Sequence, residues 1–127
     1  MKLAGFYGIF VGLMMAAQWA FFIAAGLVPE LQTEPIRIGF HLAGEFITAL
    51  GLITSGTALL RKAAWGRNAY LLFTGMLAYS AIVSPGYFAQ QRQWIFVAMF
   101  ALLLVLAAAC ALAVARPSIK GGEYARL

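Results

Sequence analysis

Four long apolar stretches constrain this chain more than any other feature. They cover approximately residues 3–28, 38–60, 68–90 and 94–115, and each reaches the length of about 20 apolar residues that a membrane-spanning helix needs. Inside a bilayer the backbone N–H and C=O groups find no water, so a single spanning segment must be helical. Because the connections are short, the sequence predicts an all-α integral membrane protein, a four-helix bundle with up-down-up-down topology.

The composition agrees with a membrane location and excludes an ordinary soluble globule. Of the 127 residues, 64% are hydrophobic and only 10% are charged, which is far from the soluble average. The first apolar run is much longer than the roughly 7–15 residues of a signal-peptide core, so we interpret it as a retained helix, which Pro29 ends. We expect one transmembrane domain over residues 1–116, with helices at about 3–28, 35–60, 68–90 and 94–115. Residues 117–127 hold too little apolar surface to fold and are predicted to be a mobile cytoplasmic tail.

The basic residues predict the orientation of the chain. With the N-terminus inside, only Arg37 and Arg92 face outward, and seven basic side chains face inward: Lys2, Arg61, Lys62, Arg67, Arg116, Lys120 and Arg126. The positive-inside rule therefore predicts a multi-pass membrane protein with both termini inside. We expect the membrane to be a bacterial or archaeal plasma membrane. The net charge is +5, but these residues lie at helix ends and form no aromatic-studded patch, so we expect no nucleic-acid partner.

A polar stripe on the second helix is the main candidate for a functional site. Steps of three and four residues keep to one helix face, and His41, Glu45 and Thr48 share such a face. Glu45 lies roughly 10 Å below the outer end of this helix. An ionised side chain deep in the membrane costs about 2.5–3.5 kcal/mol on insertion scales, and it is retained where it has a partner or a function. We therefore expect Glu45 to face the interior of the bundle.

Polar side chains of two other helices reach the same depth, in the outer half of the bundle. They are Gln18 and Trp19 of the first helix, and Tyr79, Ser80, Ser84 and Tyr87 of the third. Pro85 predicts a kink beside them, because it cannot donate a helical hydrogen bond. The inner half is expected to consist of glycines, alanines and branched apolar residues. The fourth helix has no ionisable residue, and we expect it to serve lipid contact or packing.

Structural interpretations of the same residues stay open. His41 and Glu45 can neutralise each other across one helical turn, and Gln18 and Trp19 can simply hydrogen bond and pack. His41 and Glu45 supply two metal ligands where the usual sites need three or four, so no metal is expected. Cys110 is the only cysteine, and its expected role is packing. The sequence contains no nucleophile triad, phosphate-binding loop or dinucleotide fingerprint, which leaves open whether the protein is an enzyme.

Three glycines on one side of the first helix suggest a second class of function. Gly5, Gly8 and Gly12 allow the backbone of a neighbouring helix to come close. That neighbour can belong to the same chain, or to a membrane-protein partner or second copy, which would make the protein a structural or assembly subunit. A proton-coupled transporter is the third alternative. Four-helix drug exporters carry their membrane glutamate in the first helix, however, and this chain has none there.

The second helix and the turn after it, GEFITALGLITSGTALLRKAAWGRNAYLLFTGM, resemble the second-helix signature of the DoxX-like superfamily of small four-helix membrane proteins. The matching residues are Glu45, Gly51, Leu52, Gly56, Arg61, Lys62, Ala63, Ala64 and Met76. The resemblance implies a membrane subunit of an oxidoreductase assembly, since some members handle sulfur compounds with a quinone acceptor. The resemblance to this superfamily points to only one candidate site residue, Glu45. The arginine that the family carries early in the first helix is absent from the corresponding stretch, FYGIFVGLMM.

These observations lead to a first hypothesis, a ligand-binding or redox-partner membrane protein. Its outer-half cavity would hold a small hydrophobic molecule with a polar head, with a quinone or a lipid as the candidates. Glu45 and His41 would bind the head or relay protons, Tyr79 and Ser80 would orient it, and Trp19 would stack on it. The predicted ligand-binding residues are Glu45, His41, Thr48, Gln18, Trp19, Tyr79, Ser80, Ser84 and Tyr87.

Overall fold

The computed structural model describes residues 1–116, and within them every regular element is a helix. Four segments are long and apolar enough to cross a membrane: α1 (Lys2–Ala24), α3 (Pro35–Leu60), α4 with α5 (Gly66–Val83 and Pro85–Gln90), and α6 (Trp94–Ala115). The short helix α2 (Glu30–Thr33) lies between α1 and α3. The prediction of an all-helical chain with four candidate spans is confirmed. The tail predicted over residues 117–127 lies outside the described residues.

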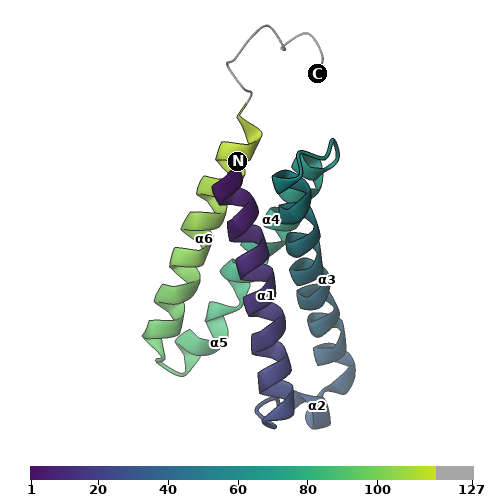
Figure 1. Cartoon of the computed structure of the whole chain (residues 1–127). Coiled ribbons are helices and arrows are strands. Elements are labelled where there is room, and N and C mark those ends of the chain that lie inside the picture. Colours follow the sequence, from purple (N-terminus) through teal and green to yellow (C-terminus); the bar gives the residue numbers. More distant parts are fainter. Residues whose placement is uncertain (117–127) are drawn as a thin grey trace, which may run out of the picture.

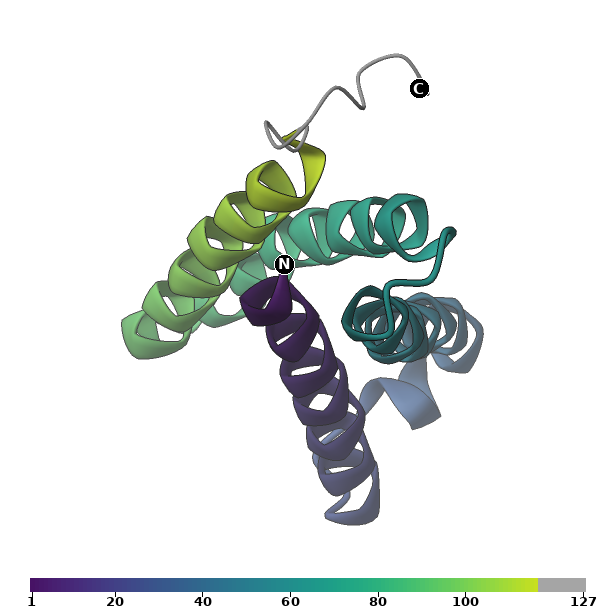
Figure 2. The same cartoon turned by 45° about the horizontal axis from the view of Figure 1, so that its top comes forward.

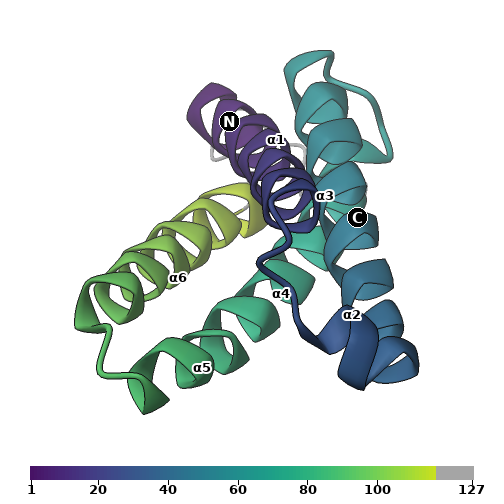
Figure 3. The same ribbon diagram turned by 90° about the horizontal axis from the view of Figure 1, so that it is seen from below.

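Successive long helices run in opposite directions (Figure 1). α1 lies between α3 and α6, and α4 lies behind it (Figure 2). α1 packs most extensively on α3, α3 on α4, and α4 on α6, whereas α5 packs on α6 and on the end of α4. Viewed along the bundle from below, α5 and the start of α6 lie on the side opposite α2 (Figure 3). The helices therefore spread apart at the end of the bundle that carries α2 and α5.

Helix α1 ends earlier than the sequence predicted. Its last residue is Ala24, and Gly26 follows with a φ of 69°, in the left-handed region that glycine adopts readily. The N–H groups of Gly26 and Leu27 donate to carbonyls of the last helical turn at 3.2 and 2.9 Å. This pair of bonds is a Schellman motif, which closes a helix end. The prediction that Pro29 ends the helix is wrong, because Gly26 has already ended it.

The other predicted boundaries agree with the structure. α3 begins at Pro35, which occupies the first helical turn, and α6 covers Trp94–Ala115. Ser84 separates α4 from α5, and Pro85 is the first residue of α5. The interruption predicted at this proline is therefore present, because its nitrogen cannot donate the next bond of the helical ladder.

The glycine face of α1 packs against α3 of the same chain. A Cβ atom added to Gly12 would lie 2.5 Å from the carbonyl oxygen of Ala49, and one added to Gly5 would lie 3.0 Å from that of Gly56. Gly5, Gly8 and Gly12 are all buried. The predicted close approach of two backbones is present, and both belong to one chain. A partner or a second copy would reach Gly5, Gly8 and Gly12 only if α1 separated from α3.

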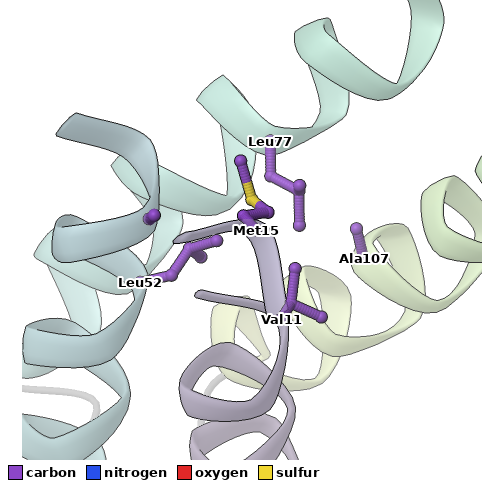
Figure 4. Packing of buried hydrophobic residues seen from close by; sticks show 6 residues of the cluster. Val11, Met15, Leu52, Leu77 and Ala107 are labelled. Atoms are coloured by element: carbon purple, nitrogen blue, oxygen red, sulfur yellow. The ribbon is translucent and has the colours of Figure 1, made fainter. Parts of the chain in front are cut away.

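Two small apolar clusters hold the four long helices together. The first joins all of them and consists of Val11, Met15, Ala49, Leu52, Leu77 and Ala107 (Figure 4). The second consists of Ala4, Leu59, Tyr70 and Val114, with Cys110 packed against it, as expected for this cysteine. α6 buries only Ala107 and Val114. Much of its remaining surface is exposed and apolar, which suits contact with lipid, because lipid tails are as apolar as leucine.

Polar side chains are also buried among these packed helices, so the expectation of a purely apolar inner half is wrong. The hydroxyl of Tyr7 on α1 donates a hydrogen bond to the carbonyl of Leu103 on α6 at 2.8 Å. Tyr70 on α4 is completely buried. Its hydroxyl lies near Thr74 and Cys110, but neither it nor the hydroxyl of Thr74 makes a hydrogen bond of good geometry within the described part of the chain. The two tyrosines therefore have different energetic roles.

Removing these two phenolic hydroxyls should change stability in opposite directions. Tyr7→Phe loses one interhelical hydrogen bond, and we expect the free energy of unfolding to fall by about 1 kcal/mol. Tyr70→Phe removes a buried hydroxyl whose lack of a partner costs about 1–3 kcal/mol, so we expect it to melt at or above the wild-type temperature. Thermal unfolding of both variants in one detergent measures the two effects. Melting of Tyr70→Phe clearly below the wild type would contradict this assignment.

Candidate functional site

The carboxylate of Glu45 is the centre of the candidate site. Glu45 is half-buried on α3 and faces α4, where the hydroxyl of Ser80 donates a hydrogen bond to its Oε1 at 2.6 Å. Charge-assisted hydrogen bonds of this kind are short and strong. The Oγ atoms of Ser80 and Ser84 are 3.3 Å apart. Because Ser80 uses its hydrogen on Glu45, Ser84 is the donor of this second bond. A chain of three polar groups thus runs from the α4–α5 junction to α3.

His41 does not pair with Glu45. Within residues 1–116 the only ion pair joins Arg37 to Glu34, both near the start of α3. The ring of His41 instead lies edge-on to Trp19 of α1, with ring centroids 5.7 Å apart and an interplanar angle of 72°. This is a favourable geometry for two aromatic rings. The structural alternative in which His41 and Glu45 neutralise each other is therefore not formed in this conformation.

A cavity of about 990 Å³ lies beside Glu45, at the upper end of the usual range for small-molecule sites. Its walls are mainly aromatic and aliphatic side chains of α1, α4, α5 and α6. Phe88 stacks on Phe96 and on Phe100, with ring centroids 4.8 and 5.9 Å away. Polar side chains also line the cavity, among them Gln18, Glu30, Arg37, Gln91 and Gln93. The cavity combines an aromatic wall with a small number of polar groups.

A second hollow of about 680 Å³ lies between α3 and α4, and we call it the α3–α4 groove. Apart from the residues it shares with the cavity, its lining consists of Phe40, Gly44, Thr48, Leu71, Leu72, Gly75, Met76 and Tyr79. Four residues line both spaces: His41, Glu45, Ser80 and Val83. The cavity and the groove therefore adjoin at these four residues, which include the hydrogen-bonded pair Glu45 and Ser80.

Seven of the nine predicted site residues line the cavity: Gln18, Trp19, His41, Glu45, Ser80, Ser84 and Tyr87. Thr48 and Tyr79 line only the groove. The Thr48 hydroxyl donates to the carbonyl of Gly44 in its own helix at 2.7 Å, so its hydrogen is already used. Tyr79 is 68% exposed. It does not line the space where the sequence predicted that it would orient a polar head.

Sequence reasoning missed the contribution of α6. Six of its residues line the cavity: Phe96, Met99, Phe100, Leu102, Leu103 and Leu106. Phe96 and Phe100 stand four residues apart, which places them on one helix face. This spacing was the only feature of the sequence that could have indicated an aromatic cavity wall on α6. It did not do so, because an aromatic pair that faces lipid has the same spacing. Tyr7, which also lines the cavity, was missed because it lies in the inner half of its helix.

The chemistry open to this arrangement is binding and proton exchange. Among residues 1–116 no group of three or more His, Cys, Asp or Glu side chains is placed to hold a metal ion. The polar groups around Glu45 are its carboxylate, the hydroxyls of Ser80 and Ser84 and the imidazole of His41, and further polar side chains, Arg37 among them, line the same cavity. Such a set can hold a polar head group in a fixed orientation, and it can exchange a proton with it.

The comparisons with known proteins give a family but no function. A family model described as a domain of unknown function, DUF8058, matches residues 1–121. No curated protein and no solved structure matches the chain. Because the match covers almost the full length of 127 residues, the chain belongs to the DUF8058 family.

Proposed function

We propose that this protein binds a small hydrophobic molecule with a polar head in the outer half of a four-helix membrane bundle. The observation that carries the proposal is the place of Glu45. Its half-buried carboxylate accepts the hydrogen bond of Ser80 at 2.6 Å, on the wall of an aromatic-lined cavity of about 990 Å³. Sites of this size usually have mostly apolar walls and few polar groups, which orient the ligand.

The energy of membrane insertion supports a functional role for Glu45. An ionised side chain at the centre of a spanning helix costs about 2.5–3.5 kcal/mol on insertion scales. Ser80 contributes one hydrogen bond, and a carboxylate has acceptor positions for several. The free positions on Glu45 suit a ligand with a hydrogen-bond donor. The series Ser84, Ser80 and Glu45 also provides a short path along which a proton can reach such a ligand.

The orientation that we propose is N-in and C-in across a bacterial or archaeal plasma membrane. The first residue of α1, the α3–α4 turn and the end of α6 lie together at one end of the bundle (Figure 1). The basic residues Lys2, Arg61, Lys62, Arg67 and Arg116 belong to these segments. Arg37 and Arg92 belong to the opposite end. This asymmetry supports the proposed orientation, because it matches the positive-inside pattern. In that orientation Glu45 would lie in the outer half of an up-down-up-down bundle.

The ligand class that fits best is a quinone or a lipid, and the physiological role would be that of an accessory subunit in an oxidoreductase assembly. The stacked rings of Phe88, Phe96 and Phe100 offer a surface for a flat head group. The relation to the DoxX-like superfamily, through Glu45 and the residues after it, is part of this proposal. The alternative of an assembly subunit loses its main support, since α3 already covers the glycine face of α1.

Native mass spectrometry of the gently purified full-length protein tests the proposal. We expect the wild type to retain a small amphiphile, and Glu45→Gln to retain about tenfold less, because a charged hydrogen-bond acceptor is worth about 1.5–3 kcal/mol. His41→Ala should weaken retention less, because His41 lines the cavity without a bond to the central carboxylate.

Glu34→Gln is the matched control for this experiment. Glu34 is also a carboxylate of the α3 region, but it is exposed, pairs with Arg37 and lines neither space. Its replacement releases Arg37, which lines the cavity, but leaves Glu45 and Ser80 in place, so retention should fall less than in Glu45→Gln. Equal retention in Glu45→Gln and the wild type, or no bound amphiphile in either, would refute the proposal. Retention of a second protein chain instead would favour the assembly alternative.

A further inference from the structure

The α3–α4 groove has a different shape from the cavity that it adjoins. The cavity is the larger space and has an aromatic wall. The groove follows two neighbouring helices, and on α4 its lining extends from Leu71 to Val83, which is roughly 18 Å along a helix axis. It therefore runs in the direction of the helices, which is also the direction of acyl chains in a bilayer.

Two glycines keep the groove open. Gly44 on α3 and Gly75 on α4 both line it, and an added Cβ atom at either position would meet nothing within 4 Å. By contrast, glycines at helix contacts in this protein, such as Gly12, leave no room for a Cβ atom. The groove glycines are not needed for helix packing, and the space in front of them is free.

The polar atoms of the groove are concentrated on the wall it shares with the cavity. The carboxylate of Glu45, the hydroxyl of Ser80 and the imidazole of His41 belong to both spaces. The hydroxyl of Thr48 is used within its own helix. The rest of the groove is formed by apolar and aromatic side chains and by the glycines, among them Phe40, Leu71, Leu72 and Met76.

We propose that one amphiphile occupies both spaces, with a flat hydrogen-bonding head in the cavity and a single linear hydrocarbon tail in the α3–α4 groove. Its head would meet Glu45 at the shared wall, and its tail would leave the protein toward the bilayer between α3 and α4. This inference rests on the proposed function and specifies its ligand class as single-tailed. The occupant follows from the shared lining, because the same carboxylate borders both the aromatic cavity and the mainly apolar groove.

Photo-crosslinking with an alkyl hydroquinone that carries a diazirine at the end of its tail tests the inference. The full-length protein is placed in lipid nanodiscs, labelled, and digested for mass spectrometry. We expect labelling of Leu71, Leu72 or Met76 that excess untagged alkyl hydroquinone abolishes.

Gly75→Leu should reduce this labelling about tenfold, because its side chain fills the groove. Gly39→Leu is the matched control. It also adds a leucine where a Cβ meets nothing within 4 Å, but Gly39 lines neither space, and labelling should not change.

The outcomes separate this inference from the proposed function. Competable labelling confined to α6 residues of the cavity, such as Met99 or Leu102, would overturn the tail assignment and leave the binding role of Glu45 intact. Competable labelling of the groove that Gly75→Leu does not reduce would also overturn it. If an excess of untagged alkyl hydroquinone does not reduce the labelling at any position, both proposals are refuted for this ligand class. Circular dichroism of Gly75→Leu and Gly39→Leu shows whether both variants remain folded.

Discussion

Gly12→Ala should lower the free energy of unfolding by about 2 kcal/mol, the net of two opposing effects. A Cβ atom at this position would lie 2.5 Å from the carbonyl oxygen of Ala49 and 2.7 Å from Cγ1 of Ile53. The isoleucine side chain can turn away, but the backbone of α3 can move only if the helices separate. Overpacking of this kind costs about 1–3 kcal/mol, and we expect the upper end of this range because the closest atom belongs to the backbone. Alanine recovers up to about 1 kcal/mol through its better helix propensity.

Thermal unfolding in detergent, followed by circular dichroism, measures this effect. A loss of about 2 kcal/mol should lower the midpoint by roughly 8 °C in a chain of this length. Gly75→Ala is the matched control, since it has the same gain in helix propensity and no neighbour within 4 Å. We expect it to melt at or above the wild-type temperature. If Gly12→Ala and Gly75→Ala melt together, the backbones of α1 and α3 do not approach as closely as described.

Arg67→Met should have an effect of similar size at the end of α6. The guanidinium of Arg67 on α4 donates from Nε to the carbonyl of Val114 at 3.0 Å and from its second terminal nitrogen to that of Ala115 at 2.7 Å. Carbonyls of the last helical turn have no partner within their own helix, and a positive charge there also stabilises the helix dipole. Because one of the two bonds is exposed to solvent, we expect a total loss of about 2 kcal/mol.

Hydrogen exchange at the end of α6 checks this prediction together with the unfolding midpoint. In Arg67→Met the amides of the last turn should exchange faster, about tenfold for a local loss near 1.4 kcal/mol. Arg67→Lys should recover part of the stability, since it keeps the charge but cannot present two donors in a fixed fork. Arg61→Met is the control, because the Arg61 side chain makes no hydrogen bond to residues 1–116. Unchanged exchange in Arg67→Met would show that Arg67 does not hold α6.

The contacts of Arg67 also show what a count of basic residues in the sequence cannot give. In the sequence, Arg67 was one of seven basic residues that predicted the orientation of the chain. In the structure the same guanidinium joins the start of α4 to the end of α6 across 47 and 48 residues of sequence. The predicted orientation and the contact between α4 and α6 therefore involve the same residue, and only the contact requires knowledge of which helix ends meet.

The amino-acid sequence by itself determined the number of candidate spans and most of their boundaries. Runs of about 20 apolar residues admit only helices in a membrane, and Pro35 and Pro85 act through their own backbone chemistry wherever the helices pack. The distance of Glu45 from the start of its helix is also a local property, because the rise per residue and the residue number fix it. These features need no information about neighbours.

Tertiary structure alone decided which groups meet. Periodicity places Glu45 and His41 on one face of a helix, but it does not say which helix lies opposite or at what height. The structure pairs Glu45 with Ser80, 35 residues away, and His41 with Trp19, and it covers the glycines of α1 with α3. The division of the site into a cavity and a groove likewise depends on the relative rotation and height of several helices. Because many arrangements of four apolar helices bury similar area, contacts between side chains far apart in sequence are what select one.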